Sequence, residues 1–318
     1  MKKVAVIGTG QLGSRHLQGL KVASSPMEIT VMDSNEESLK IAKERYDSVS
    51  PIGEKNVKYV TSIDDLPEEL DLVIIATGSK PRASIIMSLL NHSSVQYLVL
   101  EKVLFPTLND YSVIAQLLEE NGTRCWVNCP RRMFGTYKQI KESIDVSKPI
   151  HMTKADEDWG LCCNSIHMID LFMYLTGETE YSIETKWLND KIEDSKRGGY
   201  VEMTGMLKIV TPKENTLTLI SEKNFEGEKN FMIENNGYIY FIAEAGGYWI
   251  HKNEKKPFSM VYQSQLTGVL ADEILITGGC SLTSYKVSAL YHKPFIDALL
   301  EKYNKILGTP DNKLLPIT

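Results

Sequence analysis

A glycine-rich loop near the start of the chain has the residue types and the spacing to bind a dinucleotide. Its six residues are Gly8, Thr9, Gly10, Gln11, Leu12 and Gly13. The loop matches G-x-G-x-x-G, follows the apolar run 4–7 and opens a helical segment, which is the context that this motif requires. Gly8 permits a tight turn, Gly10 lets the backbone approach a pyrophosphate, and Gly13 lets helix and strand pack closely. Free N–H groups at the helix start then face the phosphates. The alternative is a glycine turn that holds no ligand.

An acidic residue at the end of the second expected strand distinguishes between the two common dinucleotides. Asp33 follows Val31 and Met32, where a carboxylate can accept hydrogen bonds from both ribose hydroxyls of the adenosine half. Its charge would repel a 2′-phosphate, and no Arg or Lys follows within the next few residues. The sequence therefore predicts NAD as the cofactor rather than NADP. The alternative is that Asp33 only caps the turn Asp-Ser-Asn.

These residues need a sheet to hold them, and the first 128 residues have the pattern that predicts a parallel one. Short apolar segments alternate with helical segments, which is typical of βαβ units with right-handed crossovers and helices on both faces. The expected strands are residues 4–7, 28–32, 57–60, 72–76, 97–100 and 125–127. The expected helices are residues 12–22, 36–46, 82–90 and 108–120.

The pattern changes near Pro130. Helices are expected over 134–144, 160–175 and 284–306. Between them, alternating segments follow one another without helices, at residues 182–187, 200–210, 216–222, 230–233 and 238–243. Such alternation predicts a mostly antiparallel sheet with one covered face. We therefore expect an N-terminal Rossmann domain with a doubly wound parallel sheet over 1–128, and a C-terminal α/β substrate domain over 129–318.

Composition excludes several classes of protein. The formal net charge of −6 and the pI of about 5.6 argue against a nucleic-acid binder, which needs a clustered basic face. No apolar stretch approaches the roughly 20 residues that span a bilayer. The five cysteines are odd in number and include the adjacent pair Cys162 and Cys163, which fits a reducing cytoplasm. Cys125 and Cys129 have no second ligand pair for zinc, so no metal is expected.

Three further motifs carry a resemblance to a known family. Ile75-Ala76-Thr77 looks like an I-A-T turn beside a cofactor, and Glu101-Lys102 looks like an E-K-P motif. Residues 165–170, Ser-Ile-His-Met-Ile-Asp, look like G-x-H-x-x-D. With these motifs the chain resembles the glucose-fructose oxidoreductase, inositol dehydrogenase and MocA (Gfo/Idh/MocA) family over nearly its whole length. That family combines a Rossmann domain with an α/β domain whose large open sheet often serves as an oligomer interface.

The resemblance implies an NAD-dependent oxidoreductase that transfers hydride to or from a secondary alcohol or ketone of a sugar, cyclitol or nucleotide sugar. It implies that Lys102 binds the reacting oxygen and that His167 moves the proton. Such a pair makes chemical sense, because hydride leaves carbon only as the hydroxyl proton is removed. The expected cofactor contacts are the glycine loop, Asp33, Ala76, Thr77, Glu101 and Lys102. A homodimer or homotetramer is the expected assembly.

The chain departs from the family pattern at three positions. Val103 stands where the family has proline, and Cys163 stands where it has an acid four residues before the histidine. Arg82 aligns with a histidine that many members have after the fourth strand. These departures keep two alternatives open: a non-catalytic NAD-binding sensor, and a lyase or hydrolase that retains NAD. The direction of reaction, the substrate and the oligomer size stay open too.

Other residues are candidates for contact with the substrate. Arg131, with Arg132 beside it, suits a carboxylate or phosphate, and it equally suits a solvated pair at a domain junction. Trp159 can stack on a sugar or pack in a core, and Asn164 lies next to Cys163. Asp170, one turn beyond His167, can orient the imidazole or face the core. Lys102 can instead be a surface lysine, and His167 a core histidine satisfied by Asp170 or a backbone carbonyl.

Overall fold

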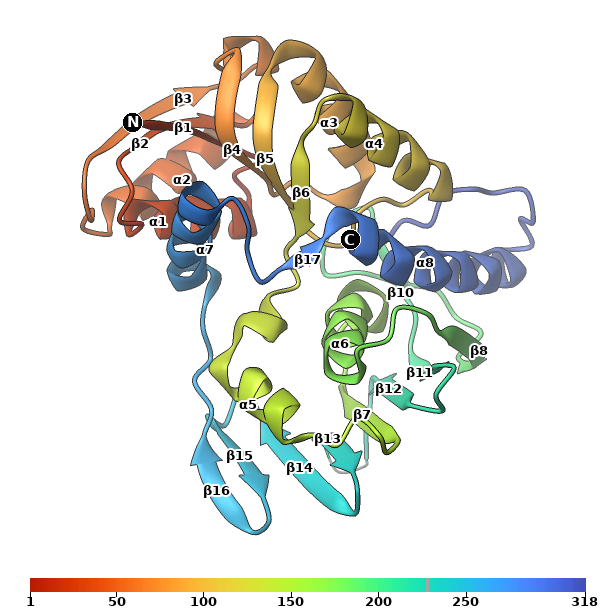
Figure 1. Ribbon diagram of the computed structural model, residues 1–318. Coiled ribbons are helices and arrows are strands. Elements are labelled where there is room, and N and C mark those ends of the chain that lie inside the picture. The colour runs from red at the N-terminus through yellow and green to blue at the C-terminus, as the bar shows by residue number, and fades with distance from the viewer. Residues whose placement is uncertain (227–228) are drawn as a thin grey trace. The chain divides into compact units, whose positions relative to one another are not determined.

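The chain folds into two compact units. The computed structural model describes residues 1–226 and 229–318 (Figure 1). The first unit comprises residues 1–105, 109–128 and 261–285, and the second comprises 106–108, 129–260 and 286–318. The sequence placed residues 261–285 in the second domain, whereas the structure places them in the first unit.

The first unit is a doubly wound sheet, as the sequence predicts. Its strands run in the order β17-β6-β5-β4-β1-β2-β3, and all pairs are parallel except β17 with β6. The strands are β1 (Lys2–Ile7), β2 (Met27–Met32), β3 (Lys55–Val60), β4 (Glu69–Ile75), β5 (Ser94–Leu100), β6 (Arg124–Val127) and β17 (Thr283–Ser284). Continuous apolar runs such as Val4–Ile7 are buried, because helices cover both faces of this sheet.

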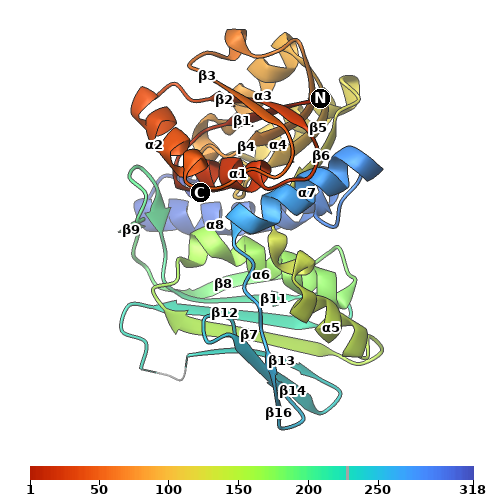
Figure 2. The same cartoon turned by 90° about the vertical axis from the view of Figure 1, so that its left-hand side faces the viewer.

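The helices of this unit are α1 (Gln11–Lys21), α2 (Glu36–Asp47), α3 (Ser79–His92), α4 (Leu108–Glu120) and α7 (Gln263–Thr277), with a short turn η1 (Ile63–Asp65). α1 and α2 lie on one face of the sheet, and α3 and α4 on the other (Figure 2). Local sequence explains where α2 starts, because the side chain of Asn35 accepts hydrogen bonds from the amides of Glu37 and Ser38.

Helix α7 is absent from the elements that the sequence predicts, and it packs along α1. Two glycines allow this close approach, since a Cβ at Gly19 would lie 2.6 Å from Thr267 Cβ and one at Gly268 would lie 2.6 Å from the Gly19 oxygen. The Asp272 carboxylate of α7 accepts hydrogen bonds from the amides of Ser24 (2.7 Å) and Ser25 (2.9 Å). It also accepts from both serine hydroxyls, each at 2.6 Å.

We expect Asp272→Ala to loosen α7 from the first unit. Burial raises the pKa of Asp272, but the bonds from Ser24 and Ser25 outweigh it, so the pKa lies below its usual value. The carboxylate therefore stabilises the fold above the unfolded pKa of about 3.9, and this contribution is lost as pH falls through the folded value. At pH 7 the loss should be about 1–2 kcal/mol, seen as a roughly 5- to 30-fold faster amide exchange in α7. Glu273→Ala is the matched control, and equal exchange in both variants would contradict this docking role.

The second unit is built on an eight-stranded sheet in the order β16-β15-β14-β13-β7-β12-β11-β8. Only β7 with β12 is parallel, which confirms the predicted mostly antiparallel sheet. These strands are β7 (Ile150–Glu157), β8 (Ser182–Leu188), β11 (Gly205–Val210), β12 (Thr216–Glu222), β13 (Asn230–Asn235), β14 (Tyr238–Ala243), β15 (Tyr248–His251) and β16 (Glu254–Pro257). A separate ribbon pairs β9 (Glu193–Asp194) with β10 (Val201–Glu202).

The helical elements of this unit are η2 (Pro130–Met133), α5 (Gly135–Ser143), α6 (Leu161–Thr176) and α8 (Tyr285–Leu307). α5 and α6 lie on the same face of the sheet (Figure 2). The expected strand over 200–210 was wrong in one respect, because Met203 and Thr204 separate β10 from β11. The segments that became β15 and β16 were not predicted as strands.

Candidate cofactor and active site

The carboxyl ends of the parallel strands form an even row. The last residues of neighbouring strands are paired with one another. In the strand order β2, β1, β4, β5 and β6, these residues are Met32, Ile7, Ile75, Leu100 and Val127. The residue after each strand end therefore lies in the next row, at the edge where such sheets bind ligands. This row contains Gly8, Asp33, Ala76, Glu101 and Asn128. The sequence predicted four of these five positions as cofactor contacts and missed Asn128.

The glycine loop has the geometry that the motif predicts. Gly8 has a φ of +87°, and a Cβ there would lie 2.8 Å from the Thr77 nitrogen. A Cβ at Gly13 would lie 1.8 Å from the Gly8 oxygen, so neither position accepts a larger residue. A Cβ at Gly10, by contrast, would meet nothing within 4 Å. The backbone at Gly10 thus faces open space in which a phosphate can approach.

The start of α1 suits an anion. Gly10 is its N-cap and supplies no side-chain cap, and the first turn has no acidic residue. Gln11 is exposed there and Leu12 is half-buried, while the Gln11 side chain accepts a hydrogen bond from Arg45 of α2 at 2.9 Å. Amides in the first helical turn have no partner within the helix, so they favour a negatively charged ligand.

Asp33 is anchored to the glycine loop. Its Oδ2 accepts hydrogen bonds from the Thr9 amide (2.6 Å) and the Thr9 hydroxyl (3.0 Å). Its Oδ1 accepts one from the Asn35 amide at 2.9 Å. The turn-capping role that the sequence left open is therefore present. It does not exclude ribose binding, because each carboxylate oxygen has two lone pairs and the side chain is half-exposed.

Two buried polar atoms beside the end of β5 support the presence of a ligand at this edge. Thr77 follows β4 and Asn128 follows β6, and these strands are the two neighbours of β5. Within the described residues, Thr77 Oγ1 and Asn128 Oδ1 are buried without a hydrogen-bond partner. Buried polar groups are usually satisfied, so both atoms are suited to bind the polar end of a dinucleotide or an ordered water. Together with the open space at Gly10, they fit NAD or NADP.

Glu101 is held by a buried network that the sequence did not reveal. Its Oε1 accepts hydrogen bonds from Asn128 Nδ2 (2.5 Å) and pairs with His16 Nε2 (2.8 Å), and Glu101 is only 3% exposed. On the other side of the imidazole, His16 Nδ1 lies 3.0 Å from Thr267 Oγ1 of α7. Asn128 also donates to Gln263 of α7 at 2.9 Å. Glu101, expected to contact the cofactor, thus directs its carboxylate into the protein.

This network keeps Glu101 ionised. Burial raises its pKa, but the hydrogen bond and charge of His16, the bond from Asn128 and the charge of Lys102 together outweigh burial and lower it. Lys102 follows directly and is half-buried. The network therefore fixes the position of Glu101 just after β5, and with it the backbone position of Lys102.

Arg82 is fully buried behind the same strand end. Its guanidinium donates hydrogen bonds to the carbonyls of Thr77, Val103 and Leu104, the last at 2.9 Å. The Lys102–Val103 peptide bond is cis, although Val103 replaces the family's proline. Arg82 is thus a structural tie between the turn after β4 and the segment after Lys102.

In the second unit, α6 presents a half-exposed stripe. Most of the helix is buried, and its half-exposed positions are Cys163, Asn164, His167 and Tyr174. Spacings of three, four and seven residues place them on one face. His167 is thus accessible from one side, as a group that moves a proton must be. The structure places Lys102 and His167 in different units, so their predicted meeting beside the cofactor stays a prediction.

The other predicted substrate contacts already have partners within the second unit. Arg131 donates to both oxygens of Glu244, from Nε and Nη2 at 2.9 Å each, and Asp170 accepts from Arg132 at 2.8 Å. Trp159 donates its indole N–H to the Ile220 carbonyl, and Asn164 donates to the Trp159 carbonyl, both at 2.7 Å. The two acids explain the outcome for Arg131 and Asp170, because a partly buried guanidinium is stabilised by a paired carboxylate.

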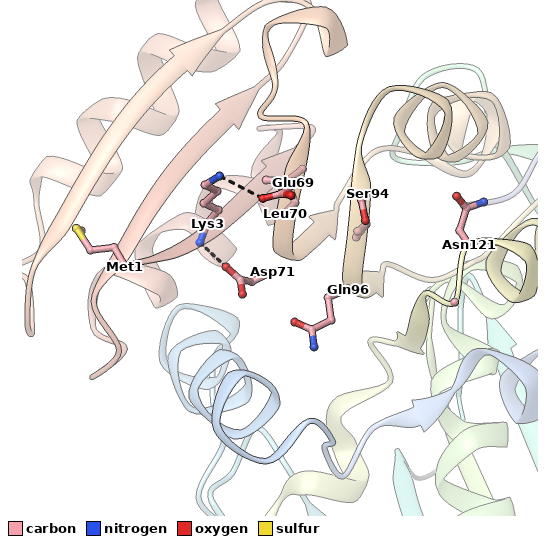
Figure 3. A pocket seen from close by; sticks show the side chains of 10 residues that line it. Met1, Lys3, Glu69, Leu70, Asp71, Ser94, Gln96 and Asn121 are labelled. Atoms are coloured by element: carbon pink, nitrogen blue, oxygen red, sulfur yellow. Dashed lines mark hydrogen bonds and ion pairs between the residues drawn. The ribbon is translucent and has the colours of Figure 1, made fainter.

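A cavity of about 440 Å³ in the first unit lies at the opposite, amino edge of the sheet (Figure 3). The Lys3 amide donates to Asp71 there (2.8 Å), and Lys3 Nζ lies 3.8 Å from Glu69. It is far from the row of strand ends that carries the glycine loop, so it does not belong to the cofactor site.

The fold and this edge define an NAD(P)-binding oxidoreductase, and comparison with known proteins agrees. Residues 2–129 match the Gfo/Idh/MocA family model, described as an oxidoreductase family with an NAD-binding Rossmann fold. This match over the Rossmann part of the chain confirms the predicted resemblance. No curated protein matches the chain.

Solved structures share the fold over nearly the full length of the chain. Biliverdin reductase from Synechocystis sp. PCC 6803, in complex with biliverdin and NADP⁺, has 14% identity and a TM-score of 0.68, with 94% of this chain and 98% of that one covered. An oxidoreductase from Agrobacterium radiobacter, in complex with NAD⁺, L-tartaric acid and magnesium, has 16% identity and a TM-score of 0.69 over 96% and 97%. UDP-N-acetylglucosamine 3-dehydrogenase from Acidithiobacillus ferrooxidans has 12% identity and a TM-score of 0.69 over 94% and 97%.

Proposed function

We propose that this protein is an NAD-dependent oxidoreductase that acts on a secondary alcohol or the matching ketone of a sugar, cyclitol or nucleotide sugar. The observation that carries the proposal is the ligand edge of the first unit, where Lys102 directly follows Glu101 at the end of β5. A cation in that place can hold an oxygen beside a cofactor bound to the glycine loop.

Each residue has a distinct part in the proposed reaction. NAD supplies the hydride acceptor when it is bound. Lys102 binds the substrate oxygen and favours its alkoxide character, while His167 accepts the hydroxyl proton or returns it in the reverse direction. Imidazole suits this task because its unperturbed pKa lies near neutrality. Asp33, through Thr9, fixes the loop and faces the adenosine ribose.

A cavity in the second unit supports a polar substrate. It has a volume of about 280 Å³ and lies at the ends of β7 and β14. Its lining combines four charged groups with two aromatic ones, namely Lys154, Asp156, Lys229, Glu244, Phe231 and Phe241. Ligand sites commonly combine such groups. In a sugar site the polar groups can form hydrogen bonds with the hydroxyls, and the aromatic groups can contact the ring. The related fold of a UDP-N-acetylglucosamine dehydrogenase is consistent with that substrate class.

We expect NAD to bind more tightly than NADP, and Asp33→Ala to narrow the difference. A carboxylate that bonds ribose hydroxyls contributes about 1.5–3 kcal/mol, or roughly 10- to 150-fold in Kd. Isothermal titration calorimetry with both cofactors measures this directly. Glu37→Ala, which removes a nearby exposed carboxylate, is the control and should leave both affinities unchanged. Tighter NADP binding by the unmutated protein would show that Asp33 does not select the cofactor.

We also propose that the uncovered face of the eight-stranded sheet joins copies of the chain into a homodimer or homotetramer. In β14, Tyr240 and Ile242 are buried under the helical side, whereas Ile239 points the other way and is 51% exposed. Exposed apolar sheet area usually meets a partner. Light scattering should give a multiple of 35.9 kDa, and Ile239→Lys should shift it toward one chain. Val146→Lys, in a loop, is the control. A mass near one chain at all concentrations would exclude this assembly.

A cytoplasmic location is the setting we propose for this enzyme. The five cysteines lie in the described part of the chain and form no disulfide with one another, and three of them are buried. Cysteines that are not joined in disulfides fit a reducing compartment. Among the described residues, no helix has the length and apolar character needed to cross a bilayer.

A further inference from the structure

The family's acid is missing one turn before His167, yet the structure brings another carboxylate to that end of the helix. Cys163 occupies the position of the acid. Glu202, the last residue of β10, accepts a hydrogen bond from the Cys162 amide through Oε2 (2.8 Å) and from the Cys163 amide through Oε1 (3.1 Å). This carboxylate comes from a strand some 40 residues further along the chain, so a motif scan does not detect it.

The start of α6 lacks any local means of neutralising its amides. Gly160 is the N-cap with a φ of +78°, it has no side chain, and the first turn contains no acidic residue. A Cβ at Gly160 would lie 3.3 Å from Glu202 Oε1 and 3.0 Å from Asn164 Nδ2. Glycine therefore leaves room for the carboxylate. An anion at a helix N-terminus is stabilised by the helix dipole as well as by the amide bonds.

Glu202 is bound to the cysteine side chains as well as to the backbone. Burial holds the pKa of Glu202 above its usual value, and hydrogen bonds from the Cys163 thiol and from the amides of Cys162 and Cys163 lessen that rise without cancelling it. Burial, with the charge of Glu202, also raises the pKa of the Cys162 thiol, so this thiol stays protonated. Cys163 Sγ lies 3.8 Å from Ser195 Oγ, beside the same ribbon.

Cys163 and His167 belong to the half-exposed stripe of α6 and are separated by one turn. Four residues of helix correspond to about 6 Å along its axis. The amide that binds the Glu202 carboxylate therefore lies about one turn from the backbone of His167, within the roughly 10 Å over which charges act on one another at 0.1 M salt. The other charged or titratable groups at this helix are its own Asp170, paired with Arg132 of η2, its own Tyr174, under Lys141 of α5, and Tyr291 of α8.

We propose that Glu202 is the carboxylate that replaces the missing acid at position 163, and that it is a positioning residue for His167. It fixes the first turn of α6, so that His167 is presented in one orientation, and its charge favours the protonated imidazole. The catalytic part of this role rests on the proposed function, but the effect on His167 does not.

The test follows the ring of His167 by NMR in histidine-labelled protein, with the signal assigned by its absence in His167→Asn. In Glu202→Gln the ring should titrate at a lower pH than in the unmutated chain, by about 0.5 pH unit or a threefold change in proton affinity. In the double variant Cys163→Asp/Glu202→Gln, the titration should return toward the original pH, because the carboxylate is restored from within the helix. Glu202→Asp, which keeps the charge, should resemble the unmutated chain.

The control is Asp194→Asn, which removes an exposed carboxylate from the neighbouring strand β9 and should leave the titration unchanged. If Glu202→Gln lowers thermal stability but His167 titrates as before, Glu202 is only a helix cap and the proposal is wrong. The same holds if the double variant fails to restore the titration. No substrate is needed for these measurements. A shifted and restored titration in a protein that oxidises no alcohol would reject the proposed function and leave the role of Glu202 intact.

Discussion

His167→Asn should lower turnover about 100- to 10,000-fold, the usual cost of removing a general base, while NAD affinity stays nearly unchanged. Lys102→Ala should have an effect of similar size, because the substrate oxygen loses the cation that stabilises its developing charge. Initial rates on a panel of sugars, cyclitols and nucleotide sugars measure turnover, and calorimetry measures cofactor binding for each variant.

Two control variants make this test specific. His151→Asn removes an exposed histidine of β7, and Lys148→Ala removes an exposed lysine next to that strand. Both should retain full activity. If a substrate is found and the variants at His167 and Lys102 turn it over at the unmutated rate, the assignment is wrong. If NAD binds and the panel yields no turnover, a non-catalytic NAD-binding protein or an NAD-retaining lyase becomes the better explanation.

The second large effect concerns stability. His16→Leu should destabilise the first unit by about 3–5 kcal/mol, because it leaves the buried Glu101 carboxylate without the imidazole that binds it. Adding Glu101→Gln should recover part of that loss, since the uncompensated charge is then gone. Denaturant unfolding, followed by exchange of the amides in α1 and β5, measures both variants. Arg15→Leu, a change on the exposed side of α1, is the control.

The pH dependence of this network has a defined sign. The pKa of Glu101 is lowered in the folded protein, so its contribution is present above the unfolded value of about 4.3 and is lost as pH falls through the folded one. A double variant that is no more stable than His16→Leu alone would show that Glu101 carries no buried charge.

Much of the cofactor site follows from local sequence. The spacing of Gly8, Gly10 and Gly13 predicts a loop at a strand end, and the structure gives each glycine the predicted surroundings. Alternation of short apolar strands with helices predicts the doubly wound sheet, and parallel pairing then brings the strand ends to one edge. These features depend on contacts between neighbouring segments, so the amino-acid pattern alone was sufficient to locate Asp33, whereas the role of Lys102 was implied by the family resemblance.

Other features depend on residues distant in the sequence, and only the tertiary structure decided them. His16 forms a hydrogen bond with Thr267 of α7, which lies 251 positions away in the sequence, and this contact helps to hold α7 in the first unit. Arg131 pairs with Glu244, which lies 113 positions away in the sequence, and so its guanidinium already has a carboxylate partner within the protein. Glu202 supplies a carboxylate beside Cys163 from 39 positions away. Hydrophobic periodicity describes which face of an element is buried, but it does not say which distant polar group will be buried against that face.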